Sequence, residues 1–341
     1  MICGIGCVAT VGDFSLSQTV IPPTLTSFHV HKRSVLDLFN PCASVFICGF
    51  KVLDGATGSE LERRGVDTSL PLWSARTLLD APEILAQIHR EYLEAGADAI
   101  TTNTFRTHRR SLAKAGLGER ARELTKRAVE IAQRVRDEAN PSARILGSVA
   151  PLEDCYAPAL APPADECARE HGEMIRHLVE AGVDFLLIET MNNLTEAKAA
   201  IQAARCALPG RWIASFCMRR HGPPGFLLSG ERIDALMPSL SDSYAIGINC
   251  VPAPDMESQV RHLRSIASPT AQIVAYANVG RPDSLRGWMN TDAVSPARYA
   301  DYAQAWLDAG ATIIGGCCGT TPATIAALRQ LLRHQSNSDI T

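Results

Sequence analysis

The chain has 341 residues, of which 46% are hydrophobic and 20% are charged, so it is a globular protein large enough for one big domain or two small ones. A formal net charge of -3 gives no electrostatic reason to expect a nucleic acid or an anionic membrane as a partner. No apolar run approaches the roughly 20 residues of a membrane-spanning helix. Eleven cysteines, an odd number in a long chain, argue against a disulfide scaffold and favour the reducing cytoplasm.

Residues 1–49 differ in composition from the rest of the chain. They carry few charges, show no helical period and contain the turn-prone pairs Pro22-Pro23 and Asn40-Pro41. We expect a poorly ordered extension or a start codon placed too early, and a targeting segment or regulatory arm is the alternative. The first residues lack the positive region of a secretory signal.

From Lys51 onward, short apolar runs alternate with amphipathic stretches of helical spacing. The runs lack in/out alternation, which is typical of parallel strands buried on both faces. We predict eight such strands, at residues 51–54, 99–102, 144–149, 185–189, 212–216, 244–249, 273–277 and 312–315.

A repeated phrase connects several predicted helices to the strands that follow. It contains Gly96, Gly182 and Gly310, and in each case a glycine in left-handed geometry would end a helix two or three residues before a strand. The pattern predicts an α/β fold of the (β/α)₈ (TIM) barrel type, as one domain over residues 50–335 with a tail at 336–341. An open doubly wound sheet is the alternative, but no Gly-x-Gly-x-x-Gly turn follows the first strand.

In such a barrel the active site lies at the carboxyl ends of the strands. Cys250 ends one predicted strand, and the pair Cys317-Cys318 ends another. If the two strands are neighbours, three thiolates meet at one face and form a catalytic zinc site with an open fourth position for a substrate thiol. The alternative is that each cysteine is a small buried hydrophobic residue. Adjacent residues share one ion only where the strand has become a loop, and Gly315, Gly316 and Gly319 would allow that turn.

Polar residues end other predicted strands, among them Asp54, Asn103 and Glu189. Asp54 opens a glycine-containing turn that either exposes backbone amides to a ligand carboxylate or is simply capped by the aspartate. Glu189 follows four apolar residues, where an unpaired carboxylate is costly, so we expect a cationic partner. A substrate ammonium and an arginine from a neighbouring strand are both suitable. Cys217 has no second ligand nearby and is expected in the core.

Together these motifs resemble the homocysteine S-methyltransferase family over residues 51–334. The resemblance rests on six motifs: Leu53-Asp54-Gly55-Ala56-Thr57-Gly58, Pro71-Leu72-Trp73-Ser74-Ala75, Gly96-Ala97-Asp98 with Thr102-Asn103-Thr104-Phe105, Ile188-Glu189-Thr190, Gly247-Ile248-Asn249-Cys250, and Gly315-Gly316-Cys317-Cys318-Gly319-Thr320-Thr321-Pro322. It implies that Cys250, Cys317 and Cys318 are catalytic ligands of Zn²⁺. It also implies that Glu189 and Asp54 help to fix the amino acid part of the acceptor substrate. We expect Asn103, at the end of another predicted strand, to be a substrate-binding residue as well.

The resemblance implies methyl transfer to the sulfur of homocysteine, which forms methionine. The length leaves no room for folate and cobalamin modules, so we expect a small sulfonium donor, S-methylmethionine or S-adenosylmethionine, with Trp73, Tyr156 and Trp288 as candidate aromatic contacts. A betaine or selenocysteine-type methyltransferase on the same barrel, and a noncatalytic thiol sensor, remain alternatives. The sequence leaves the oligomeric state open.

Overall fold

The computed structural model describes residues 49–283 and 287–338, which belong to one compact unit that begins at Gly49. The extension predicted for residues 1–49 lies outside this part, apart from Gly49, as do residues 339–341 of the predicted tail. Within the described ranges, no helix is long and apolar enough to cross a membrane.

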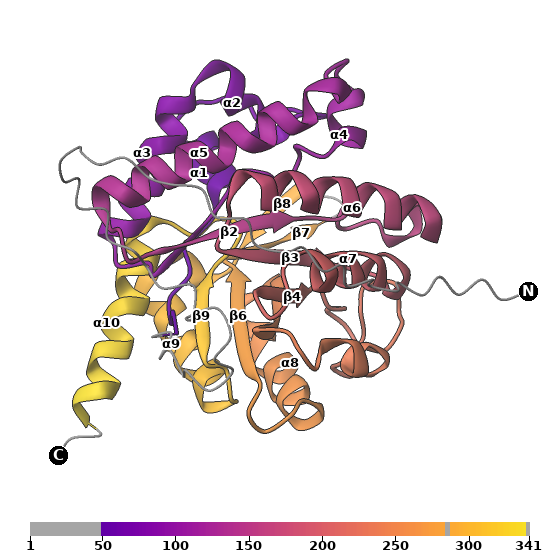
Figure 1. The fold of residues 1–341 in the computed structure, drawn as a ribbon. Helices are drawn as coiled ribbons and strands as arrows, with labels where there is room; N and C mark the ends of the chain where they lie inside the picture. Colours follow the sequence, from indigo (N-terminus) through magenta and orange to yellow (C-terminus); the bar gives the residue numbers. More distant parts are fainter. Residues whose placement is uncertain (1–48, 284–286, 339–341) are drawn as a thin grey trace, which may run out of the picture. The chain divides into compact units, whose positions relative to one another are not determined.

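A seven-stranded parallel sheet forms the centre of the unit, in the order β1-β2-β3-β4-β5-β6-β9 (Figure 1). These strands correspond to seven of the eight predicted runs: β1 (Ala99–Thr101), β2 (Arg144–Val149), β3 (Phe185–Met191), β4 (Trp212–Phe216), β5 (Ala245–Pro252), β6 (Gln272–Asn278) and β9 (Ile313–Gly316). An antiparallel hairpin of β7 (Gly280–Asp283) and β8 (Gly287–Asn290) follows β6 and is absent from the sequence prediction.

The first predicted strand, residues 51–54, does not form a regular strand. It makes two isolated parallel bridges, Val52 to Ile314 of β9 and Leu53 to Ala99 of β1. Accordingly, the Leu53 N–H donates to the Ile314 carbonyl at 2.8 Å and the Asp54 N–H donates to the Ala99 carbonyl at 3.1 Å. Because this segment contacts both edge strands, the sheet curls until β1 and β9 flank the same four residues.

Helices cover the outer side of the curled sheet (Figure 1). Gly96, Gly182 and Gly310 have φ of 102°, 85° and 109°, so the left-handed geometry predicted at these three connections is present. After β4 the chain forms a 3₁₀ helix, Ile233–Leu240, which contains Pro238. The α-helices of the described part are α1 (Thr57–Arg63), α2 (Thr77–Asp80), α3 (Pro82–Glu94), α4 (Arg109–Ala113), α5 (Ala121–Ala139), α6 (Ala164–Ala181), α7 (Leu194–Ala207), α8 (Ala253–Ile266), α9 (Pro296–Asp308) and α10 (Pro322–Ser338).

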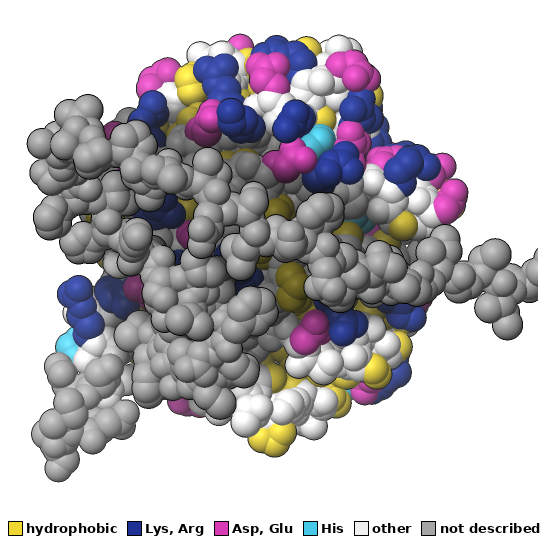
Figure 2. Space-filling view, in the orientation of Figure 1, with side chains coloured by type: hydrophobic (Ala, Val, Ile, Leu, Met, Phe, Trp, Pro, Cys, Tyr) yellow, Lys and Arg dark blue, Asp and Glu magenta, His cyan; other side chains and the backbone are white. Residues whose placement is uncertain are grey.

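Charged side chains of both signs are mixed over the helices at the top of the view in Figure 2. Ion pairs link these helices, as between Arg109 and Glu173 at 2.9 Å and between Arg110 and Glu170 at 2.7 Å. Such pairs are partly exposed and contribute little each, so they specify how α4 and α6 pack rather than stabilise the fold strongly.

Along the strands, the side chains of one face change from apolar to polar toward the carboxyl end. Phe185, Leu187, Val274 and Tyr276 belong to a buried cluster contributed by alternate positions of the strands. Glu189 lies two residues beyond Leu187 on the same face. It is buried and accepts a hydrogen bond from Ser148 of β2. The alternation therefore gives an apolar level deep in the sheet and a polar level near its carboxyl end.

Candidate active site

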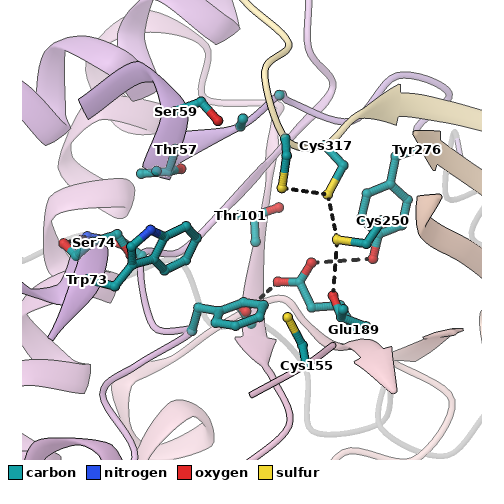
Figure 3. A pocket seen from close by; sticks show the side chains of 18 of the residues that line it. Thr57, Ser59, Trp73, Ser74, Thr101, Cys155, Glu189, Cys250, Tyr276 and Cys317 are labelled. Carbon is teal, nitrogen blue, oxygen red and sulfur yellow. Dashed lines mark hydrogen bonds between the residues drawn. The ribbon is translucent and has the colours of Figure 1, made fainter. Parts of the chain in front are cut away.

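Three cysteine sulfur atoms come together at the carboxyl end of the sheet. Cys250 lies near the end of β5, and Cys317 and Cys318 follow β9, where the strand has already become a turn. The Sγ atoms lie within 4.8 Å of one another; Cys250 and Cys317 are 3.0 Å apart, and Cys317 and Cys318 are 4.0 Å apart (Figure 3). The structure thus unites residues 67 positions apart in the sequence.

The predicted role of glycine in this turn applies most directly to Gly319, which has φ of 81°. Gly315 and Gly316 belong to β9, and they are required by close packing instead. A Cβ on Gly315 would lie 2.6 Å from Cβ of Leu53, and a Cβ on Gly316 would lie 2.3 Å from Oγ1 of Thr320. The turn therefore depends on one left-handed glycine and two glycines without room for a side chain.

Three polar residues, Thr190, Asn249 and Asn278, hold the cysteine segments in place. The sequence placed Asn278 among the strand ends that build the site, but it gave no role to Thr190 or Asn249. Asn278 donates from Nδ2 to the Cys250 carbonyl at 3.0 Å and accepts at Oδ1 from the Cys318 N–H at 3.1 Å. Asn249 donates to Oγ1 of Thr190 at 2.7 Å, and this oxygen lies 3.6 Å from Sγ of Cys250. The signal available in the sequence was their position at or just after the ends of predicted strands.

The cysteines form part of the wall of a cavity of about 290 Å³. This cavity is near the lower end of the range for small-molecule sites. All six predicted site residues line it: Asp54, Asn103, Glu189, Cys250, Cys317 and Cys318. Cys217 does not; it is buried, and its Sγ lies 3.8 Å from the Cys250 carbonyl.

Two carboxylic acids, Asp54 and Glu189, are buried in the cavity wall, and no cationic side chain among the described residues forms an ion pair with either. Asp54 accepts from the Thr101 N–H at 2.7 Å and from Oγ1 of Thr101 at 2.9 Å. Glu189 accepts from Oγ of Ser148 and contacts the Tyr276 hydroxyl at 3.5 Å. Burial raises the pKa of Asp54 to about 7 and the pKa of Glu189 to about 8.

Asn103 lies in the same wall but is already engaged. Its Nδ2 donates to the Ser74 carbonyl at 2.8 Å, and its side chain is 3% exposed. This bond anchors the short 3₁₀ helix Trp73–Arg76, so Asn103 supports the shape of the cavity whether or not its Oδ1 atom contacts a substrate.

Aromatic side chains form another part of the wall. Trp73, Phe105 and Tyr156 line the cavity, and the rings of Trp73 and Phe105 meet edge to face with centroids 5.4 Å apart. Gly58 makes room for the indole, because a Cβ there would lie 2.3 Å from Cζ2 of Trp73. Trp288, the third aromatic contact predicted, is not part of this wall and is 42% exposed.

Backbone strain is concentrated at the cavity. In the described part of the chain, the residues other than glycine with positive φ are Trp73 (47°), Thr190 (59°) and Cys250 (56°), and all three line the cavity. Such a conformation costs on the order of 1–3 kcal/mol and persists where the surroundings fix it, as they do at binding and catalytic sites.

The comparisons with known proteins agree with this geometry. A family model described as homocysteine S-methyltransferase matches residues 51–332. The homocysteine S-methyltransferase YbgG of Bacillus subtilis is 34% identical over 80% of this chain and 91% of its own length. A selenocysteine Se-methyltransferase of Brassica oleracea is 31% identical over 83% of this chain and 89% of its own length.

A solved structure has the same fold. The metallated form of the homocysteine methyltransferase MmuM from Escherichia coli superposes with a TM-score of 0.72 at 29% identity, over 85% of this chain and 99% of that one. The resemblance seen in the sequence motifs is therefore confirmed, and the chain belongs to the homocysteine S-methyltransferase family, a family of methyltransferases.

Proposed function

We propose that the protein transfers a methyl group from a small sulfonium compound to the sulfur of homocysteine, with zinc held by Cys250, Cys317 and Cys318. The observation that carries the proposal is the meeting of three thiols and two buried acids in one cavity. A thiol sensor has no need of the two acids, whereas an amino acid substrate that carries both a thiol and an ammonium would use both groups.

The donor set fits zinc. Thiolates are soft ligands that select zinc among the common divalent ions, and three of them leave one position of a tetrahedral ion free. Two thiolates on such an ion are about 3.8 Å apart, from Zn–S bonds of about 2.3 Å. The separations of 3.0 and 4.0 Å lie on either side of this value. When bound, zinc would lower the pKa of an acceptor thiol so that the thiolate is present near neutral pH.

Asp54 and Glu189 would bind the ammonium of the acceptor. A cation beside them favours their charged forms, so it reverses the effect of burial on their pKa values. The reaction then requires little more than alignment: the acceptor sulfur forms a bond to the methyl carbon, the bond from that carbon to the donor sulfonium breaks, and its electron pair returns to the donor sulfur. The thiol proton passes to solvent water before this displacement.

The fold and the compartment belong to the same proposal. We take residues 51–54 as a short eighth strand that closes a (β/α)₈ barrel, since they bridge to both edge strands. Free thiols as metal ligands need a reducing environment, which favours the cytoplasm.

Betaine as donor and selenocysteine as acceptor remain candidates, and the 31% identity to a selenocysteine methyltransferase supports testing selenocysteine.

A substrate screen tests the proposal. The full chain loaded with zinc is incubated with homocysteine and, separately, with S-methylmethionine, S-adenosylmethionine or betaine carrying an isotopically labelled methyl group. We expect labelled methionine with a sulfonium donor, and loss of the product after removal of the metal by a chelator. Selenocysteine in place of homocysteine tests the second acceptor. Absence of transfer with every pair would contradict the proposed function.

A further inference from the structure

Arg106 is the cationic side chain that lines the cavity in the described part of the chain. It follows β1 in the segment that also carries Asn103 and Phe105. The other charged residues in the wall, Asp54 and Glu189, are acids. The cavity thus has two carboxyl groups that can bind a cationic part of a ligand and one guanidinium that can bind an anionic part.

The guanidinium of Arg106 is fixed by the protein but incompletely satisfied. Its Nη1 donates to the Glu153 carbonyl at 3.1 Å, and its Cζ lies 5.5 Å from the centroid of the Phe105 ring. Its Nε is buried and has no hydrogen-bond partner in the described part of the chain. A guanidinium has five N–H donors, and leaving a buried donor without an acceptor costs about 1–3 kcal/mol. The Nη2 atom also makes no hydrogen bond within the described residues, and unlike Nε it is not buried, so it is the donor available to a ligand in the cavity.

Carboxylates of the protein do not supply that acceptor. The ion pairs of the described residues give Arg106 no carboxylate partner. Glu153 contacts Arg106 through its backbone carbonyl, but its carboxylate pairs with Arg110 at 3.5 Å and with Lys114. Asp54 and Glu189 take their hydrogen bonds from Thr101, Ser148 and Tyr276.

The position of Arg106 distinguishes the two substrates. Glu189 contacts Tyr276 and lies on the side of the cavity near Cys250, as Figure 3 shows, so an acceptor held by its ammonium and sulfur occupies that side. Arg106 instead contacts Phe105, whose ring packs on Trp73. This aromatic wall suits the sulfonium of a donor, since cations bind the faces of aromatic rings.

We propose that Arg106 binds the carboxylate of the methyl donor and so selects donors that carry one, such as sulfonium derivatives of amino acids. The inference rests on the proposed function. A guanidinium matches the two oxygens of a carboxylate with parallel hydrogen bonds, and a lysine does not reproduce this geometry. Donor specificity then depends on an ionic contact at one end of the molecule and an aromatic contact at the sulfonium.

The test compares two donors in wild type, Arg106→Gln and Arg106→Lys. One donor is S-methylmethionine, and the other is (3-aminopropyl)dimethylsulfonium, which lacks only the carboxylate. For Arg106→Gln we expect kcat/KM for S-methylmethionine to fall about 10- to 100-fold, with a change below about threefold for the second donor. The KM for homocysteine should stay constant, and Arg106→Lys should recover part of the loss.

Arg205→Gln is the matched control, because Arg205 pairs with Asp242 at the surface. Equal losses for the two donors, or a rise in the KM for homocysteine alone, would overturn the assignment. Calorimetric titration of each donor accompanies the kinetics: binding of S-methylmethionine that is equally strong in wild type and Arg106→Gln would also overturn it. Transfer that fails in wild type with every donor refutes the proposed function, while the titration still decides the role of Arg106.

Discussion

Asp54 is an acid whose burial in the cavity wall gives the folded protein a pH dependence. Burial raises its pKa from 3.8 to about 7, against the opposing effect of the hydrogen bonds from Thr101. A group with a higher pKa in the folded state stabilises the fold fully below its unfolded pKa, and this stabilisation is lost as the pH rises through the folded pKa. Through Asp54, the free energy of unfolding should therefore fall between about pH 4 and pH 7.

Asp54→Asn should remove this part of the pH dependence. Urea denaturation of both proteins at about pH 5 and about pH 8 measures it. The unfolding free energy of the variant should gain on that of wild type at the higher pH, because only wild type then holds a buried carboxylate at position 54. If the unfolding free energies of wild type and variant differ by the same amount at the two pH values, Asp54 has the same charge in the folded and the unfolded protein.

Glu189 makes a separate test of substrate recognition. Glu189→Gln keeps the shape and a hydrogen-bond acceptor for Ser148 but removes the charge. We expect the KM for homocysteine to rise about 10- to 100-fold, which corresponds to the value of a hydrogen bond to a charged group. The zinc content should stay the same. Normal homocysteine binding together with zinc loss would place Glu189 in the surroundings of the metal instead.

At the scale of elements, the ends of parallel strands explain why distant residues meet. Asn278, the last residue of β6, bonds to both Cys250 and Cys318 and so connects the end of β5 to the turn after β9.

Asn278→Ala should lower zinc affinity by about 10- to 100-fold, the usual effect of removing a group that orients metal ligands. Competition with a coloured chelator measures the affinity. Unchanged affinity would mean that the two segments hold their positions without this residue.

The order of strands and the residues at their carboxyl ends were predictable from the sequence, because apolar runs and polar termini are local patterns. This is why Asp54, Glu189 and the three cysteines could be expected on one face, and they line the same cavity. The hydrogen bond by which Asn249 and Thr190 support Cys250 could not be predicted, since it depends on positive φ at Thr190 and Cys250. The β7–β8 hairpin was missed for a related reason: Gly280–Asp283 and Gly287–Asn290 contain few of the residues typical of strands.

For the molecule as a whole, the cavity is built from residues between Leu53 and Cys318, and the family match begins at residue 51. We therefore expect a protein without residues 1–45 to keep full methyl transfer activity. Steady-state kinetics of the truncated and full-length proteins provide the comparison. Insoluble or inactive truncated protein would show that the extension contributes to folding or to the site.

The central claim is that three thiols from two segments hold one zinc ion needed for methyl transfer. Its most direct test is the zinc content, by elemental analysis, of Cys250→Ala, Cys317→Ala and Cys318→Ala, with turnover measured on the same samples. The exposed Cys206, varied to Ala, is the control. We predict one zinc per chain and normal turnover in wild type and the control, and loss of both in each of the three variants with the fold intact. A variant of the three that retains stoichiometric zinc and turnover would contradict the claim.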